Sequence, residues 1–251
     1  MHRQPDNRGA RATRAFTLVE LLVVIGIIAL LISILLPALQ SAQEQAKKVK
    51  CASALRNVGQ SIHIYATDNK GKLPQHAGNP VYWLWDLPNQ TRDAMLKSGN
   101  HRDTLYCPSN ERQNADALWN YGGANPLGYT VTGYFFLIRR PNGGLPQLQA
   151  FGANPPLRMK YLESITDKQR DAGRNSPAEI ELAADATLST TVNIRTARFS
   201  AVQGGWPEPH WSNHLKGEKA TGGNILFLDG HVTWRPLSQM KVWLTSPPQW
   251  F

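Results

Sequence analysis

The chain is poor in cysteine and lacks the short motifs that mark common catalytic sites. Only Cys51 and Cys107 occur among its 251 residues, too few for a disulfide-dense scaffold or a four-thiolate zinc site. A glycine-rich phosphate loop, a serine nucleophile elbow and a cysteine nucleophile with its helper residues are not recognisable either. The sequence therefore gives no positive reason to expect an enzyme.

Acidic side chains are outnumbered, with 18 Asp and Glu against 27 Lys and Arg, a formal net charge of +9. Such an excess points to nucleic acid only where the basic residues gather in a patch or stripe. Here four arginines lie in the first 15 residues and the other basic residues are scattered, so nucleic acid is not an expected partner. The average composition, 41% hydrophobic and 18% charged, argues against general disorder and against a polytopic membrane protein.

Charge is almost missing between Arg14 and Glu44, where Glu20 is the only charged side chain in 29 consecutive residues. The 24 residues 16–39 are mostly aliphatic, and about 20 such residues suffice to cross a bilayer. Arginines before this segment and none directly after it place the N-terminus in the cytoplasm. A cleaved secretory signal fits poorly, because the apolar run is too long and no small-x-small site follows it.

Glu20 is anomalous in this setting, since a carboxylate within an apolar span is costly unless it finds a partner. Its own span contains no cation. The partner must therefore come from the chain's own terminus or from another molecule.

Residues 14–25, RAFTLVELLVVI, resemble the prepilin signature of type IV pilins and type II secretion pseudopilins. The resemblance implies that a prepilin peptidase cleaves between Ala15 and Phe16 and methylates the new amino terminus. Glu20 is then the fifth residue of the mature protein, where its carboxylate pairs with the Phe16 amine of a neighbouring subunit. The family usually has Gly before the cut, and this chain has Ala15 instead. Pro37 stands where pilin-like stems commonly carry a helix-kinking proline, although by itself it could equally end the span.

The predicted organisation has four parts and an α+β fold. A basic leader, 1–15, precedes a transmembrane helix, 16–39, and an amphipathic stem helix, 40–71, with an exported head over 72–251. One stem face carries apolar residues every three or four positions: Leu39, Ala42, Ala46, Val49, Ala52, Leu55, Val58, Ile62 and Tyr65.

The head is expected to be an antiparallel sheet on which this long helix packs, as in pilins. Strands are predicted over 134–138 and 179–184, and a hairpin joins 224–228 to 231–235 across Asp229-Gly230, a pair that favours a two-residue turn. Glycine and proline mark 139–176 as a loop insertion.

The stretch Gly223–Val232 resembles the closing motif of bacterial prepilin-type proteins, in which nine residues separate a His from an Asp-Gly hairpin. His214 is the counterpart here, but 14 residues separate it from Asp229. Cys51 and Cys107 also resemble paired features of those proteins, which leaves open a disulfide between stem and head or two free buried thiols. No cofactor is expected, although the resemblance leaves room for a structural calcium ion, with Asp185 and Asp229 as weak candidate ligands.

Two rivals use other residues of the head. A metal-dependent enzyme could be built on His210, His214 and His231, but the prolines around His210 disfavour the helix that such spacing needs. The eight tryptophans could bind glycan if three or more formed a coplanar exposed row, whereas core packing is the simpler interpretation.

The sequence thus predicts a non-enzymatic, pseudopilin-like structural subunit. Prepilin peptidase, other pilin or pseudopilin subunits, the assembly platform and the membrane are its expected partners. Its expected location is the bacterial inner membrane, with a single pass and the head in the periplasm or outside the cell. The alternative is a membrane-anchored envelope protein that binds glycan or cargo and never polymerises.

Overall fold

The computed structural model describes residues 17–71, 73–74, 83–123, 128–137, 176–204, 208–245 and 248–250. The chain divides into two compact units, residues 1–43 and 44–251. Nearly all of the predicted insertion over 139–176 lies outside the described residues.

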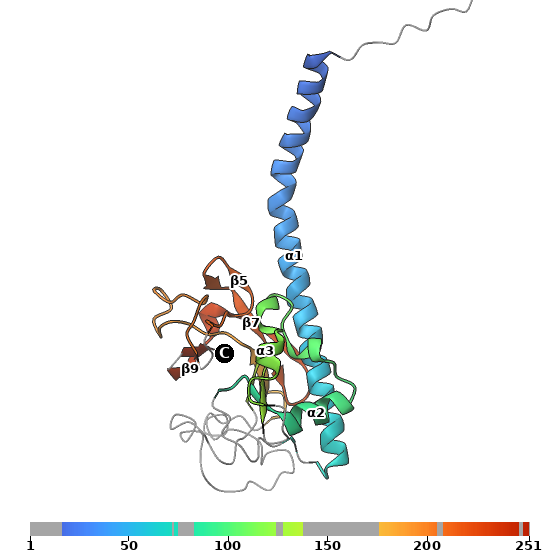
Figure 1. Ribbon diagram of the computed structural model, residues 1–251, viewed down its shortest axis with the longest axis vertical. Helices are drawn as coiled ribbons and strands as arrows, with labels where there is room; N and C mark the ends of the chain where they lie inside the picture. The colour runs from blue at the N-terminus through green and yellow to red at the C-terminus, as the bar shows by residue number, and fades with distance from the viewer. Residues whose placement is uncertain are drawn as a thin grey trace, which may run out of the picture. The chain divides into compact units, whose positions relative to one another are not determined.

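A single helix, α1, runs from Leu18 to Asp68 and continues through Pro37 without a break (Figure 1). The prediction of one long helix is confirmed over these residues, while a kink at Pro37 stays a prediction. The helix ends as predicted, because Gly71 takes the left-handed conformation with φ of 81° and its N–H donates to the Ala66 carbonyl.

The head contains a four-stranded antiparallel sheet, as predicted. Its order is β3 (Tyr134–Phe136), β4 (Glu181–Asp185), β7 (Gly222–Phe227) and β8 (Val232–Pro236). Hydrophobic residues cover both faces of its central strands, so β4 and β7 are buried along their whole length.

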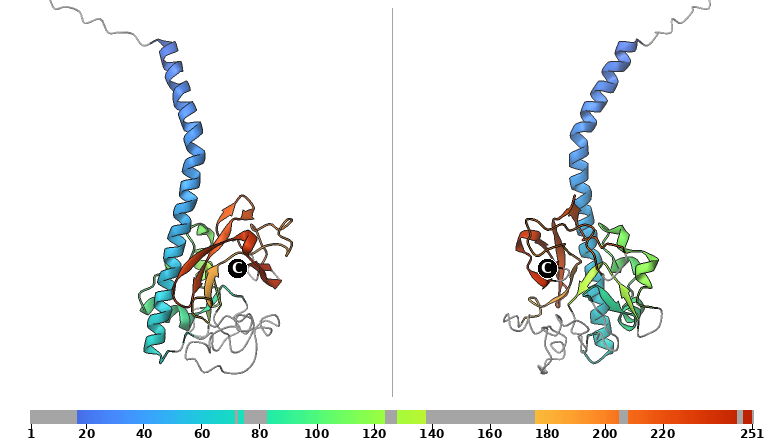
Figure 2. Two further views of the ribbon diagram at one scale, coloured as in Figure 1. Left: turned by 180° about the vertical axis from the view of Figure 1, so that it is seen from behind. Right: turned by 60° about the vertical axis from the view of Figure 1, so that its left-hand side comes forward.

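One face of the sheet receives the part of α1 that belongs to the second unit (Figure 2). Leu55, Val58 and Ile62 are fully buried there against Tyr134 and Leu226. Gly59 allows this close approach, since a Cβ at that position would lie 3.0 Å from Leu226 Cδ1. The other face packs against a second cluster that includes Trp85, Phe135 and Ile225.

The predicted apolar stem face is buried in the head at Leu55, Val58 and Ile62, half-buried at Ala52 and Tyr65, and exposed from Leu39 to Val49. Val49 is 68% exposed and Leu39 is 55% exposed, because the buried face of α1 begins only at Cys51. Apolar spacing alone could not show where the helix leaves the head.

The predicted hairpin joins β7 to β8, but its connection is longer than the two residues expected. Phe227 pairs with His231, and Gly230 N donates to the Phe227 carbonyl. Three residues, 228–230, thus form the loop, and Gly230 takes a φ of 89°. Glycine at the last position is what a three-residue hairpin requires.

Short elements complete the head. The antiparallel pairs are β1 (Asp86–Pro88) with β2 (Tyr129–Val131), β5 (Leu215–Lys216) with β6 (Lys219–Ala220), and β9 (Val242–Thr245) with β10 (Pro248–Trp250). Among the described residues, the other helices are α2 (Asn89–Lys97), α3 (Asp116–Trp119) and the 3₁₀ turns η1 (Arg102–Leu105), η2 (Glu111–Gln113) and η5 (Leu237–Gln239).

Candidate functional site

The start of α1 forms a reciprocal cap between Thr17 and Glu20. The Glu20 carboxylate oxygen Oε2 accepts hydrogen bonds from Thr17 N and Thr17 Oγ1, both at 2.8 Å, and Glu20 N donates to Thr17 Oγ1 at 3.2 Å. This is a capping box, and its Thr-x-x-Glu pattern was visible in the sequence. Within the described part of the chain, all contacts to this carboxylate come from Thr17 through Oε2. Ala15 and Phe16 lie outside the described residues.

The apolar segment that follows the cap is uncovered by protein. Its large apolar side chains are all exposed, with exposed fractions between 46% at Val24 and 77% at Leu18. Its most apolar stretch buries no residue within the protein. The helix is long and apolar enough to cross a membrane, which indicates a single-pass membrane anchor.

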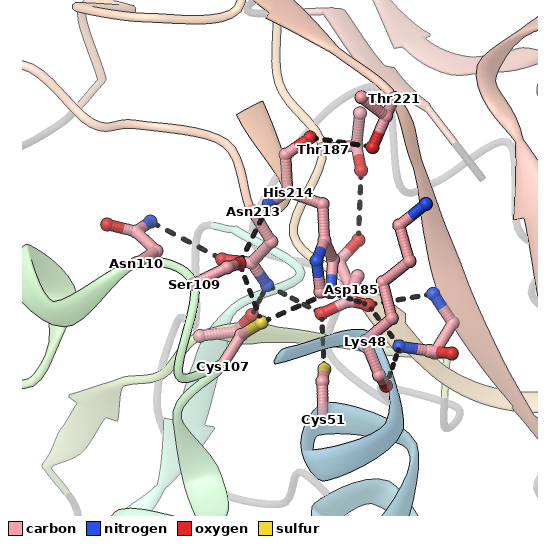
Figure 3. Close-up of polar contacts among 12 residues, drawn as sticks. Lys48, Cys51, Cys107, Ser109, Asn110, Asp185, Thr187, Asn213, His214 and Thr221 are labelled. Atoms are coloured by element: carbon pink, nitrogen blue, oxygen red, sulfur yellow. Dashed lines mark hydrogen bonds and ion pairs between the residues drawn. The ribbon is translucent and has the colours of Figure 1, made fainter. Parts of the chain in front are cut away.

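In the second unit, four side chains with the chemistry of metal ligands or nucleophiles meet inside the protein (Figure 3). Cys51 comes from α1, Cys107 from the segment after η1, Asp185 from the end of β4 and His214 from the segment before β5. All four are buried, and their sulfur, oxygen and nitrogen atoms lie within 4.8 Å of one another. We call this set the Cys-Asp-His cluster.

Contacts within the cluster are short. The Cys51 thiol donates to Asp185 Oδ1 at 3.0 Å, His214 Nε2 lies 3.2 Å from Asp185 Oδ2, and Cys107 Sγ lies 3.3 Å from His214 Nε2. The structure thus brings together the two cysteines for which a disulfide was considered, but it keeps both as free thiols.

A polar shell holds the cluster in place. Asp185 accepts hydrogen bonds from Asn213 Nδ2 at 2.7 Å and from Asn224 N and Nδ2 at 2.7 and 3.1 Å. Ser109 Oγ accepts the His214 N–H at 2.8 Å and lies 3.0 Å from Cys107 Sγ. His214 itself has a φ of 52°, a strained conformation that these bonds and two from Thr221 to the His214 carbonyl maintain.

The electrostatics of the cluster are dominated by Asp185 and His214. Burial alone would lower the pKa of His214, but the adjacent Asp185 carboxylate raises it to about 10. Burial likewise acts to raise the pKa of Asp185, but His214 and the hydrogen bonds from Cys51 and Asn224 together hold that pKa below its usual range. Burial raises the pKa of the Cys51 thiol well above its ordinary value. The protein alone therefore holds an imidazolium–carboxylate pair beside a protonated Cys51 thiol.

The cluster does not have the geometry of a Cys-His-Asp catalytic triad. In a triad, one imidazole nitrogen faces the nucleophile and the other faces the carboxylate. Here His214 contacts both Cys107 and Asp185 through Nε2, while Nδ1 is buried without a hydrogen-bond partner among the described residues.

Other predicted site residues lie apart from the cluster. Asp229 N donates to the Pro177 carbonyl near the start of β4, whereas Asp185 lies at its other end, so these two candidate calcium ligands are not brought together. The Asp229 carboxylate instead contacts His231 in the exposed hairpin. His210 packs against Trp85, and the three histidines of the rival enzyme site form no shared site among the described residues.

The tryptophans whose side chains the structure describes are buried or half-buried in the head. None of the six whose side chains the structure describes is exposed, and Trp85 and Trp250 are buried. Trp83 stacks on Trp85 with centroids 5.4 Å apart. These six do not form the exposed row that glycan binding would require.

One comparison with known proteins supports the interpretation of the N-terminal segment. Residues 10–36 match the family model described as the prokaryotic N-terminal methylation motif. No curated protein and no solved structure matches the chain. The motif and the long apolar helix together are consistent with a prepilin-type protein, and they support a processed chain similar to type IV pilins and pseudopilins.

Proposed function

We propose that this protein is a pseudopilin-like structural subunit that assembles through its N-terminal helix into a type II secretion or type IV pilus-like filament. Prepilin peptidase would first cleave between Ala15 and Phe16 and methylate Phe16. The observation that carries the proposal is the combination of an uncovered apolar helix with a capped acid, Glu20, at its start.

The cap prepares Glu20 for an intermolecular contact. Its Oε2 atom receives both Thr17 bonds, which orients the carboxylate without supplying a cation. Oε1 makes no contact among the described residues, so it can accept the Phe16 ammonium group of a neighbouring subunit. Within an apolar environment such a charge pair is far more favourable than a lone carboxylate.

The head is proposed to lie in the periplasm or outside the cell, because the arginines precede the span. It carries no assigned chemistry in this proposal, so the subunit would act through assembly alone.

The first test is the mass of the N-terminal peptide of the chain isolated from its native membrane. A chain that starts at N-methylated Phe16 supports processing, whereas a chain that retains residues 1–15 contradicts it.

The second test separates assembly from simple anchoring. Glu20→Gln keeps a capping-box residue but removes the charge, and Glu44→Gln is a matched change on the same helix outside the apolar segment. We expect Glu20→Gln to abolish incorporation into filaments and Glu44→Gln to retain it. Equal incorporation of both variants would contradict the role of the Glu20 charge in assembly, and the absence of the wild-type chain from filaments would favour the membrane-anchored binding protein that does not polymerise.

A further inference from the structure

We propose that Cys51, Cys107, Asp185 and His214 bind a zinc ion that fastens the stem part of α1 to the head. This inference concerns the second unit alone and does not depend on processing or assembly. It rests on the donor set, the burial, the spacing and the surroundings of the cluster.

The donor set suits zinc. Thiolate, imidazole and carboxylate are all zinc ligands, and structural zinc is almost always held by four of them. Calcium and magnesium prefer oxygen ligands, and the cluster offers only one carboxylate beside two sulfurs. Sulfur and nitrogen donors thus select a transition metal over the calcium ion that the sequence left open.

The spacing also fits. Zn–S bonds of about 2.3 Å and Zn–N or Zn–O bonds of about 2.0–2.1 Å place tetrahedral ligand atoms about 3.3–3.8 Å apart. Asp185 Oδ1 lies 3.0 Å from Cys51 Sγ, Asp185 Oδ2 lies 3.2 Å from His214 Nε2, and Cys107 Sγ lies 3.3 Å from His214 Nε2. These contacts are at or slightly below that range, and the four ligand atoms lie within 4.8 Å of one another. Small side-chain adjustments would therefore surround one ion.

The surroundings are those of a closed site. All four ligands are buried, as in structural rather than catalytic zinc sites, which keep a position open to water or substrate. Asn213 and Asn224 orient the carboxylate, and Ser109 Oγ contacts Cys107 Sγ and accepts the backbone N–H of His214. Such outer contacts are the usual means of fixing metal ligands.

Zinc binding displaces three protons from the cluster. Zinc takes the place of the thiol protons of Cys51 and Cys107 and of the proton on His214 Nε2, and these protons leave to solvent. No oxidant or reductant takes part.

The test uses the full chain purified in detergent under reducing conditions. We expect about one zinc per chain by elemental mass spectrometry, and the loss of that zinc in Cys107→Ser and in His214→Gln. His210→Gln replaces another buried histidine outside the cluster and should retain the metal. Wild-type protein without bound metal, after incubation with zinc, would overturn the proposal.

Two measurements on the wild-type chain guard against variants that fail to fold. Cobalt added to the metal-free chain should give tetrahedral visible bands and a thiolate-to-cobalt charge-transfer band. Alkylation of both cysteines in the folded chain should be slow until a chelator removes the metal. A cobalt spectrum without thiolate bands, or a Cys51–Cys107 disulfide in chain isolated from its native membrane without reductant, contradicts the site.

Discussion

In α1, the residues before Gln40 and those after Lys50 differ in where their apolar side chains go. The first set is exposed on every side of the helix, and the second buries a single face that begins at Cys51. The first set contains one charged residue in its interior, whereas the second includes a thiol that bonds to a buried acid. One continuous helix thus has two kinds of surface: the first is apolar all round, as in a membrane anchor, and the second has one face packed on the sheet.

The largest expected effect comes from removing the carboxylate of the Cys-Asp-His cluster, which links α1 to the head. Asp185→Asn removes the negative charge that His214 and Cys51 contact. The buried His214 imidazolium then has no counter-charge. We expect a loss of about 3–5 kcal/mol in the free energy of unfolding, measured by denaturant unfolding of the full chain in detergent. The control is Asp229→Asn in the exposed hairpin, and similar losses for both variants would contradict the central place of Asp185.

A second pair of changes compares the two halves of α1 directly. Leu55→Ala creates a cavity beside the sheet and should cost about 2–5 kcal/mol in unfolding of the head. Leu36→Ala, at a position 49% exposed, should alter the same transition by less than about 0.5 kcal/mol. Thermal unfolding followed by tryptophan fluorescence reports the head, and a large effect of Leu36→Ala would mean that the halves are not energetically distinct.

The head should also lose free energy of unfolding in acid, because His210 is harder to protonate in the folded chain than in the unfolded one. Burial lowers the pKa of His210 to about 4, so the unfolded chain takes up the proton first, near its ordinary value. Stability is therefore full above about pH 6.5 and falls as the pH drops toward 4, by up to about 3 kcal/mol. Unfolding of wild type and His210→Gln between these pH values should show a shallower slope for the variant, and parallel curves would show that this histidine does not titrate as expected.

The smallest effect contrasts two glycines of α1. A Cβ at Gly26 meets nothing within 4 Å, so Gly26→Ala should strengthen the helix by about 0.5–1 kcal/mol through backbone entropy. At Gly59 the added methyl crowds the buried Leu226, and Gly59→Ala should cost about 1 kcal/mol net. Amide hydrogen exchange near each site measures both effects. Stronger protection in Gly59→Ala than in the wild-type chain would contradict the close packing of Gly59 against Leu226.

Much of the fold could be predicted from the sequence, because its signals are local. The long helix follows from apolar runs and the Gly71 stop, and the hairpin follows from the Asp-Gly pair. The length of the hairpin loop depends on strand register, which the pair alone does not determine. The exposure of Val49 depends on where the head ends, which is a tertiary property.

The candidate sites also differ in how far the sequence predicts them. Glu20 stands out in the sequence because it is a lone charge, and the Thr17 cap could have been found from the Thr-x-x-Glu spacing. The Cys-Asp-His cluster could not, because its four members come from separate segments of the chain. Each member had been noticed for another reason: the two cysteines for a disulfide or free thiols, His214 for the closing motif and the rival enzyme site, and Asp185 for calcium. Nothing in the sequence showed that they meet.

The spread of the cluster along the chain also imposes an order in time. Cys51 is made first and His214 last of the four, so a chain that ends before residue 214 has both thiols and the acid but lacks the imidazole. Translation therefore completes the cluster only when most of the head has been made, and a truncated head would leave two thiols and a carboxylate without that partner.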